Sequence, residues 1–155
     1  MENESLYDVF EKENYSREKK QELKAVYARS KIIVADDNRE MAHLLSSHLK
    51  LNNHDVIVCH DGASLCKALE TNDGSHDGVG VDLIITDIRM PIMDGLEAIS
   101  KIREKYCYLK IIAITAFGSE ETIKTAKLIG ADLILSKPFE LDELMTTIDR
   151  IIGEI

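Results

Sequence analysis

Five short apolar runs, separated by segments with helical periodicity, constrain the fold of residues 31–155 most strongly. The runs are KIIVA at 31–35, DVIVC at 55–59, VDLIIT at 81–86, KIIAIT at 110–115 and DLILS at 132–136. They are continuous rather than alternating, so we expect both faces of each strand to be buried. Strands that alternate with helices form right-handed βαβ units around a parallel sheet. The sequence therefore predicts an α/β fold, a doubly wound three-layer sandwich with a five-stranded parallel sheet of order 2-1-3-4-5.

The segments between the runs predict five helices. The first follows the KIIVA strand and is expected to turn one apolar stripe inward, formed by Met41, Leu44, Leu45, His48 and Leu49. The others are expected at 63–70, 95–106, 119–130 and 141–153, the fourth closed by Gly130. Leu96, Ile99 and Ile102 face inward on the third, and Leu141, Leu144, Met145, Ile148, Ile151 and Ile152 on the fifth. The pattern thus predicts five consecutive β-α pairs.

Residues 1–30 differ from the rest of the chain, because they contain no compact apolar strand. The segment SREKKQELKAVYARS predicts a helix in which Ser16 caps the N-terminus and Leu23, Val26 and Tyr27 share a face. This N-terminal helical extension is either a linker or a docking and dimerisation helix, and the sequence does not choose between them. The loop at 71–80 is long for a helix-to-strand connection and is expected to be an exposed insertion.

Charge and hydropathy exclude several classes of protein. The net charge of −9 and the lack of a basic stripe argue against nucleic-acid binding. No apolar run reaches the ~18–20 residues of a membrane span, so a cytoplasmic protein is expected. The three cysteines, Cys59, Cys66 and Cys107, contain no C-x-x-C pair and are expected to pack in the core or at its edge. The histidines, among them His54 and His60, are expected at the surface.

Polar side chains follow four of the five predicted strands at the point where each strand ends. Asp36 and Asp37 follow the first strand, Asp87 the third, Thr115 ends the fourth and Lys137 follows the fifth. In the order 2-1-3-4-5 all these ends, but not that of the second strand, meet at one edge of the sheet, where sites form in such folds. Taken singly, each residue has a structural explanation, such as a turn, a helix cap or a solvated charge. Taken together, they indicate a site.

The chemistry of these five residues is coherent. Adjacent carboxylates repel each other, and a hard divalent cation such as Mg²⁺, which prefers oxygen ligands, would neutralise them. A lysine ammonium and a threonine hydroxyl can bind the oxygens of a phosphoryl group. A carboxylate nucleophile that accepts a phosphoryl group forms an acyl phosphate. The arrangement therefore indicates phosphoryl transfer to an aspartate.

These segments also resemble a known family. IIVADDN, LIITDIRMPIMDGLEAI, IIAITA and GADLILSKPFELDEL are similar to the receiver (CheY-like) domain of two-component response regulators, over residues 31–155. The resemblance implies a flavodoxin-like (βα)5 fold and a phosphorylation switch that acts as a signalling protein rather than an enzyme on other substrates. It implies Mg²⁺ as the cofactor, for which Mn²⁺ can substitute.

The resemblance also implies a role for each site residue. Asp87 is the expected phospho-acceptor, and Thr115 and Lys137 the groups that bind the phosphoryl oxygens. The expected metal ligands are Asp36, Asp37, Asp87 and the backbone carbonyl of Arg89. Arg89 also stands where phosphatases of the haloacid dehalogenase type require a second aspartate, which argues against such an enzyme.

The implied donor is a phosphohistidine on a histidine kinase or phosphotransfer protein, and the downstream target is an unidentified protein. No DNA-binding output segment follows residue 155 in this sequence, so a stand-alone receiver is expected, and homodimerisation is compatible with it. Two alternatives stay open: a receiver excised from a hybrid kinase, and a pseudo-receiver that binds partners without being phosphorylated. Ile134, where the family usually has Tyr or Phe, keeps the second alternative open.

Overall fold

The predicted parallel sheet is confirmed by the computed structural model, which describes residues 16–19, 30–74, 80–116 and 118–153. The strands are β1 (Lys31–Ala35), β2 (Asp55–Cys59), β3 (Leu83–Asp87), β4 (Lys110–Thr115) and β5 (Leu133–Ser136). They pair in parallel in the order β2-β1-β3-β4-β5. The third strand begins two residues later than predicted, and the first, second and fourth have the predicted bounds.

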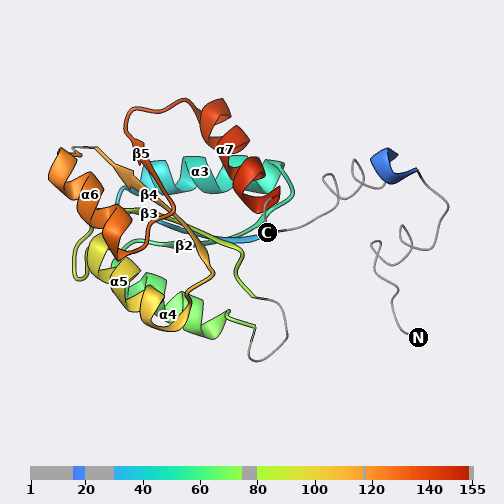
Figure 1. The fold of residues 1–155 in the computed structure, drawn as a ribbon. Coiled ribbons are helices and arrows are strands. Elements are labelled where there is room, and N and C mark those ends of the chain that lie inside the picture. Colours follow the sequence, from blue (N-terminus) through green and yellow to red (C-terminus); the bar gives the residue numbers. More distant parts are fainter. Residues whose placement is uncertain (1–15, 20–29, 75–79, 117, 154–155) are drawn as a thin grey trace.

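Five described helices cover the two faces of this sheet. They are α3 (Arg39–Leu51), α4 (Gly62–Thr71), α5 (Gly95–Lys105), α6 (Glu120–Ile129) and α7 (Leu141–Gly153). Helices α3 and α7 lie on one face, and α4, α5 and α6 lie on the other (Figure 1). Each face has its own apolar cluster, because alternate residues of the central strands point to opposite sides of the sheet.

The expectation that every strand is buried on both faces is correct only for the three central strands. The apolar residues of β1, β3 and β4 are almost wholly buried. In β2, by contrast, Val58 is 37% exposed, and Leu133, Ile134 and Leu135 of β5 are only half-buried. β2 and β5 are the two edges of the sheet, so each has a neighbouring strand on one side only.

The apolar stripe of α3 is rotated from the predicted one. Ala42, Leu45, Ser46 and Leu49 are its buried residues, whereas Leu44 is 41% exposed. In α7 the predicted stripe is confirmed, with Leu144, Ile148 and Ile151 at its centre. In α3 the sequence offers two overlapping stripes at helical spacing, and packing against the sheet selects the one that contains the small residues.

Parts of the predicted N-terminal helix and of the 71–80 loop lie outside the described residues. Where the structure does describe residues 16–19, the prediction of a cap is confirmed, because the Ser16 hydroxyl accepts a hydrogen bond from the Lys19 amide (3.3 Å). Residues 1–15 and 20–29 of the extension, and 75–79 of the loop, are outside this part of the chain. None of the helices in the described part is long and apolar enough to cross a bilayer.

Three further predictions of side-chain environment are wrong, those for Cys107, for His54 and for His60, which is half-buried. Cys107 is exposed, whereas Cys59 is buried and Cys66 half-buried as predicted. His54, expected at the surface, is buried, and its Nδ1 atom has no hydrogen-bond partner among the residues that the structure describes. His54 lies in the short connection between α3 and β2, where its amide donates to the Leu49 carbonyl (3.1 Å).

The burial of His54 predicts a pH-dependent stability. Burial lowers the pKa of His54 from its ordinary value of 6.5, against the opposing effect of the negative charges of Asp149, Asp82 and Asp55. The unfolded chain therefore binds a proton at this position more readily than the folded chain, so the free energy of unfolding falls as the pH drops below about 6.5.

We expect thermal unfolding of the His54→Gln variant to depend less on pH than that of the wild type between about pH 7.5 and 5.5, because Gln does not titrate. The matched control is His43→Gln, which removes an exposed histidine from α3. An equal pH dependence in the wild type and in His54→Gln would contradict the prediction.

Arg103 joins the C-terminal end of α5 to the turn between α6 and β5. Its guanidinium is 16% exposed and donates hydrogen bonds to the carbonyls of Gly130 (2.7 and 2.9 Å), Tyr106 (2.9 Å) and Leu109 and to the Asp132 carboxylate (3.0 Å). Gly130 has φ of 123° and lies against the Arg103 side chain, so a Cβ atom there would be strained and would meet that side chain.

We expect Arg103→Lys to lower the free energy of unfolding by about 1–3 kcal/mol, because an ammonium cannot reproduce the planar fork of donors and leaves half-buried carbonyls without a partner. The measurement is chemical denaturation, with Lys101→Arg on the exposed side of the same helix as the control. A loss no larger than that of the control would show that water satisfies these carbonyls.

Candidate functional site

Three carboxylates meet at the carboxyl ends of β1 and β3, as the sequence predicts. Asp36 directly follows β1, and Asp87 is the last residue of β3, the strand beside it. Asp36 and Asp87 are 2% and 8% exposed, whereas Asp37 is exposed. Carboxylate oxygens of the three residues all lie within 4.8 Å of one another. The structure therefore brings together one fully buried, one nearly buried and one solvent-facing carboxylate.

Lys137 supplies the positive charge at this site. It follows β5, and its amide donates to the Thr115 carbonyl at the end of β4 (2.8 Å). From there its side chain reaches back across the sheet, and Nζ lies 3.2 Å from Asp36 Oδ2 and 3.0 Å from Asp87 Oδ2. One half-buried ammonium thus bridges the two buried carboxylates.

The protonation of these groups reflects burial and mutual charge. Burial raises the pKa of the Asp36 carboxyl above its ordinary value, and the Asp87 charge adds to this, against the Asn38 amide and Lys137. Burial alone would lower the pKa of Lys137, but its hydrogen bond to Asp87 and the two negative charges raise it. The charged state of Lys137 is therefore favoured, while the charged state of Asp36 is costly.

Backbone amides hold the carboxylates in place. The Asn38 amide donates to Asp36 Oδ1 (2.9 Å), and the Arg89 amide donates to Asp87 Oδ1 (3.2 Å). Gly95, the first residue of α5, packs directly on the Asp87 carbonyl, so that any side chain there would collide with the backbone at the end of β3. Its amide donates to the Ile88 carbonyl (2.7 Å). The glycine of the MDG segment is thus explained by this close approach, whereas Asp94 caps α5 by accepting from the Glu97 amide (2.8 Å).

Thr115 lies at the same edge of the sheet, at the end of β4. It is 2% exposed, and its strand pairs with β3 so that Ile114 is opposite Asp87. Among the described residues, none forms a hydrogen bond with the Thr115 hydroxyl. The hydroxyl is therefore able to turn towards a ligand at the edge of the sheet without breaking a bond to another described residue. Arg89 is exposed, and its contact with Asp87 is through the backbone amide.

The end of β2, which the sequence analysis placed outside the site, also contacts it. The Asp36 amide donates to the Cys59 carbonyl (3.1 Å), and Nδ1 of His60 lies 2.9 Å from the Asp36 carbonyl. His60 is half-buried rather than at the surface. No sequence signal identifies this contact, because it depends on the register of β2 against β1, in which Ala35 lies opposite Cys59.

The donor set suits a hard divalent cation. Carboxylate oxygens are the ligands that Mg²⁺ prefers, and it also retains several waters, which a site open on the Asp37 side admits. Two of the three carboxylates are buried beside each other, a costly arrangement that one ammonium only partly compensates. Asp36, Asp37 and Asp87 therefore fit such an ion.

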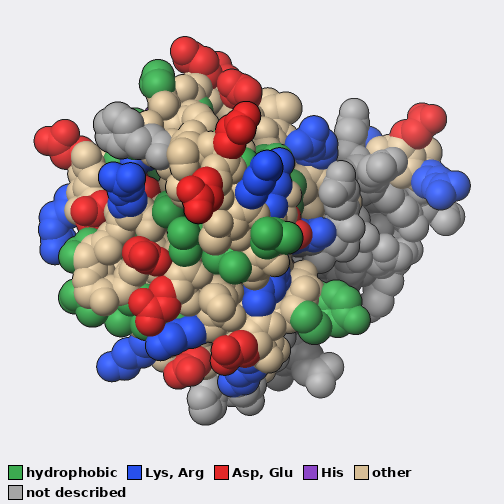
Figure 2. Space-filling view, turned by 60° about the vertical axis from the view of Figure 1, so that its left-hand side comes forward, with side chains coloured by type: hydrophobic (Ala, Val, Ile, Leu, Met, Phe, Trp, Pro, Cys, Tyr) green, Lys and Arg blue, Asp and Glu red, His purple; other side chains and the backbone are tan. Residues whose placement is uncertain are grey.

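Figure 2 shows the molecule turned so that the side with α5 and α6 comes forward. Lys and Arg side chains are interspersed with Asp and Glu side chains over this face, without a continuous basic stripe.

Comparison with known proteins identifies the family. The model of the response regulator receiver domain matches residues 32–149. The chain belongs to the response regulator receiver family. Receiver domains are phospho-accepting signalling switches that generally bind Mg²⁺ through clustered acidic residues, and the family implies a histidine kinase or phosphotransfer protein as donor.

Individual relatives agree with this assignment. The chain is 35% identical over 123 residues to the transcriptional regulatory protein CpxR of Escherichia coli, covering 79% of this chain and 49% of that protein. It is 32% identical over 115 residues to the transcriptional regulatory protein TrcR of Mycobacterium tuberculosis, covering 74% of this chain and 42% of that protein. The chain thus spans about half the length of the curated relatives it matches.

Solved structures of receiver domains superpose on the same part of the chain. The receiver domain of Francisella response regulator 1452 aligns with a TM-score of 0.72 and 27% identity, covering 81% of this chain and 98% of that one. The chemotaxis response regulator CheY4 of Vibrio cholerae aligns with a TM-score of 0.69 and 28% identity, covering 80% and 99%. The doubly wound receiver fold of this chain is therefore shown by sequence and structure together.

The buried carboxylates predict that removing one charge stabilises the metal-free protein. In the presence of a chelator we expect Asp36→Asn to unfold at a higher temperature than the wild type, because Asn cannot ionise and its burial costs less than that of a carboxylate. The control is Asp55→Asn, which removes an exposed carboxylate at the start of β2. A melting temperature equal to or below that of the wild type would show that Lys137 compensates the buried charge in full.

Proposed function

We propose that Asp87 accepts a phosphoryl group from a phosphohistidine and that this reaction switches the interactions of residues 31–155 with protein partners. The observation that carries the proposal is the position of Lys137 Nζ, 3.0 Å from Asp87 Oδ2 and 3.2 Å from Asp36 Oδ2. The Lys137 ammonium thus lies close to the place that the oxygens of a phosphoryl group on Asp87 would occupy. Membership of the receiver family supports the same role for Lys137.

The proposed reaction is a displacement at phosphorus. A carboxylate oxygen of Asp87 attacks the phosphorus, a new O–P bond forms, and the N–P bond to the donor imidazole breaks, so that the imidazole leaves with the electron pair. The product is an acyl phosphate, and the chain itself contributes mainly position and charge. The Arg89 amide donates to Asp87 Oδ1 and so fixes the orientation of the carboxylate. Oδ2 is then the oxygen that would attack the phosphorus.

Asp36, Asp37, Asp87 and the backbone carbonyl of Arg89 are the residues that would hold Mg²⁺. When bound, this ion supplies positive charge that neutralises the carboxylates and the incoming phosphoryl oxygens. Asp37 is exposed and can move towards the ion at low cost, whereas Asp36 is held by the Asn38 amide. Mn²⁺, which also prefers oxygen ligands, can take the same place.

Lys137 and Thr115 are the groups that would detect the phosphoryl group. Lys137 exchanges its bond to Asp87 for one to a phosphoryl oxygen, and the buried Thr115 hydroxyl, without a bond to another described residue, turns to donate a second. A ligand shifts a conformational equilibrium only through contacts that differ between the two states. Both contacts lie at the ends of β4 and β5, so we place the output on the surface of α6, β5 and α7.

Ile134 bears on how this output works. It occupies the family's usual aromatic position, is half-buried and packs against the apolar cluster shared by α4, α5 and α6. An isoleucine has no ring to swing between a buried and an exposed position. We therefore propose that the switch in this chain is transmitted by the backbone of β4 and β5 rather than by an aromatic rotamer.

The proposed partners follow from this function. The donor is a histidine kinase or a histidine phosphotransfer protein, and the target is a protein that binds the switched surface, with a second copy of this chain as one such partner. Residues 31–155 form the switch, and residues 1–30 are an extension that links or docks it. The same function holds whether the receiver acts alone or within a hybrid kinase.

The test is the intact mass of the protein after incubation with acetyl phosphate, with and without Mg²⁺. We expect a gain of one phosphoryl group that requires Mg²⁺ and is abolished in Asp87→Asn, because the amide is a poor nucleophile and carries no charge. Lys137→Met is expected to slow the gain by at least about tenfold, since its ammonium would stabilise the transferring phosphoryl group.

Asp94→Asn, which keeps the N-cap of α5 through its side-chain oxygen, serves as a control that leaves the site unchanged. If acetyl phosphate gives no gain, the measurement is repeated with phosphorylated histidine kinases. Absence of transfer from these as well would contradict the proposal and favour a pseudo-receiver that binds partners without phosphate.

A further inference from the structure

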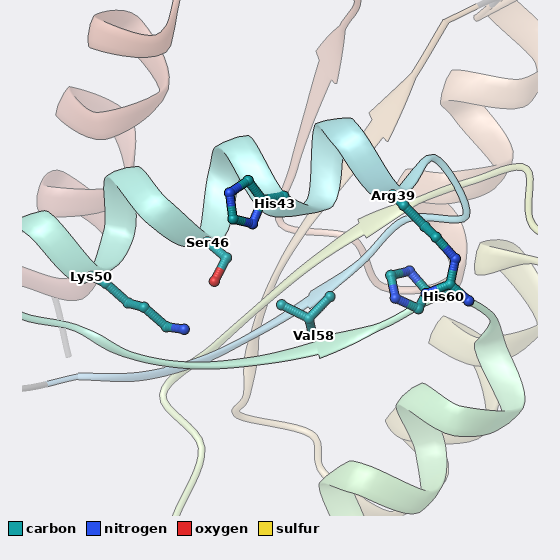
Figure 3. A pocket seen from close by; sticks show the side chains of 6 residues that line it. All are labelled: Arg39, His43, Ser46, Lys50, Val58 and His60. Carbon is teal, nitrogen blue, oxygen red and sulfur yellow. The ribbon is translucent and has the colours of Figure 1, made fainter.

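A basic groove lies between α3 and the edge strand β2, on the outside of the sheet. We define it by the six residues that line it, Arg39, His43, Ser46, Lys50, Val58 and His60 (Figure 3). The hollow has a volume of about 310 Å³ and is open to solvent. Arg39 and His60 lie at one end of it and Lys50 lies at the other.

The groove is built by the register of one helix against one strand. Arg39, His43, Ser46 and Lys50 are spaced by four, three and four residues, so they form one stripe of α3. Successive turns of this stripe place Arg39 and Lys50 about 16 Å apart along the helix, at about 1.5 Å per residue. Its cationic side chains therefore mark the two ends of an elongated depression.

The charge of the groove is opposite to that of the chain. The chain has a net charge of −9, yet Arg39 and Lys50 are both exposed, and neither forms an ion pair with any of the described carboxylates. By contrast, Arg103 and Lys137, which face inward, are each paired with carboxylates. The two charges in the groove are thus available to a ligand.

The middle of the groove is neutral. Val58 of β2 is 37% exposed there and offers an apolar surface, while Ser46, across from it on α3, is buried (Figure 3). At the end nearest Arg39, His60 directs its Nδ1 to the Asp36 carbonyl (2.9 Å), so this nitrogen carries a proton. The groove therefore presents a pattern of positive charge, apolar surface and positive charge.

We propose that the basic groove binds an extended, carboxylate-rich segment of a partner protein. An extended chain advances about 3.3 Å per residue, so about five residues would span the distance between Arg39 and Lys50. A single small anion would engage only one end, whereas a segment with acidic residues at both ends and an apolar residue between them engages the whole pattern. The site goes beyond the phosphoryl switch and does not depend on it.

The test uses fluorescence anisotropy at low ionic strength with a labelled heptapeptide that has two glutamates at each end and Ser-Val-Ser in the centre. We expect saturable binding that weakens as salt is added. Arg39→Gln combined with Lys50→Gln is expected to weaken binding about 2- to 30-fold, the range for the loss of two solvent-exposed ion pairs. The same peptide with Gln in place of Glu is expected not to bind.

The matched control combines Lys67→Gln with Lys124→Gln. It removes the same net charge from exposed positions on α4 and α6, on the other face of the sheet, and is expected to change the affinity by less than about twofold. Equal weakening in both double variants, binding of the Gln peptide, or no binding by the wild type would each overturn the proposal.

A short single-stranded DNA of equal charge distinguishes peptide from nucleic acid. Tighter binding of the DNA than of the peptide would also overturn the proposal, in favour of a phosphate-backbone site. Uptake of a phosphoryl group from acetyl phosphate is measured on the same double variants. Because neither pair of residues belongs to the proposed phosphorylation site, failure of the switch and failure of the groove are separate results.

Discussion

The ion pairs of Lys137 with Asp36 and Asp87 are the interaction on which the functional end of this sheet depends. They connect the ends of β1, β3 and β5. Lys137 is 101 residues from Asp36 and 50 residues from Asp87 in the sequence. Two carboxylates buried at 2% and 8% exposure repel each other and lose their hydration. Lys137 offsets part of this cost. The remaining negative charge of the carboxylates favours the binding of a further cation.

This constraint explains why the same residues would serve both stability and switching. A site whose charges were fully balanced would have little reason to bind a metal ion or to change when a phosphoryl group arrives. Here Lys137 has two partners at similar distances, 3.2 and 3.0 Å, and exchanging one for a phosphoryl oxygen would alter the balance around both. The backbone connection from Lys137 to Thr115 would carry that change to β4. The geometry thus supports a coupled response.

The two edge strands of the sheet, β5 and β2, border different proposed interaction surfaces. At one edge, β5 is half-buried between α6 and α7 and lies next to the proposed phosphorylation site. At the other, β2 borders the basic groove, and His60 connects that groove to the backbone of Asp36. An edge strand has only one neighbour, so its outer side is free for contacts that the central strands cannot make. The proposed interaction surfaces therefore lie at opposite edges of the sheet.

Sequence reasoning succeeded where a pattern repeats and failed where a single side chain depends on its neighbours. The bounds of α7 and of three strands were predicted, because long apolar runs and stripes average over many contacts. Leu44, His54 and Cys107 were placed wrongly, because either environment suits each of them locally and distant segments decide between them. The acidic cluster was predicted because parallel strands bring their carboxyl ends to one edge, whatever the details of packing.

The sequence by itself determined the order of strands and helices, the parallel sheet and the set of residues at its carboxyl edge, since these follow from periodicity and topology. Only the tertiary structure decided that Lys137 bridges Asp36 and Asp87, that His54 is buried with no partner for Nδ1 in the described part of the chain, and that four residues of α3 and two at β2 form a basic groove. Each of these depends on the register and separation of elements distant in the chain. Such distances are set by how side chains pack in three dimensions, which no local pattern encodes.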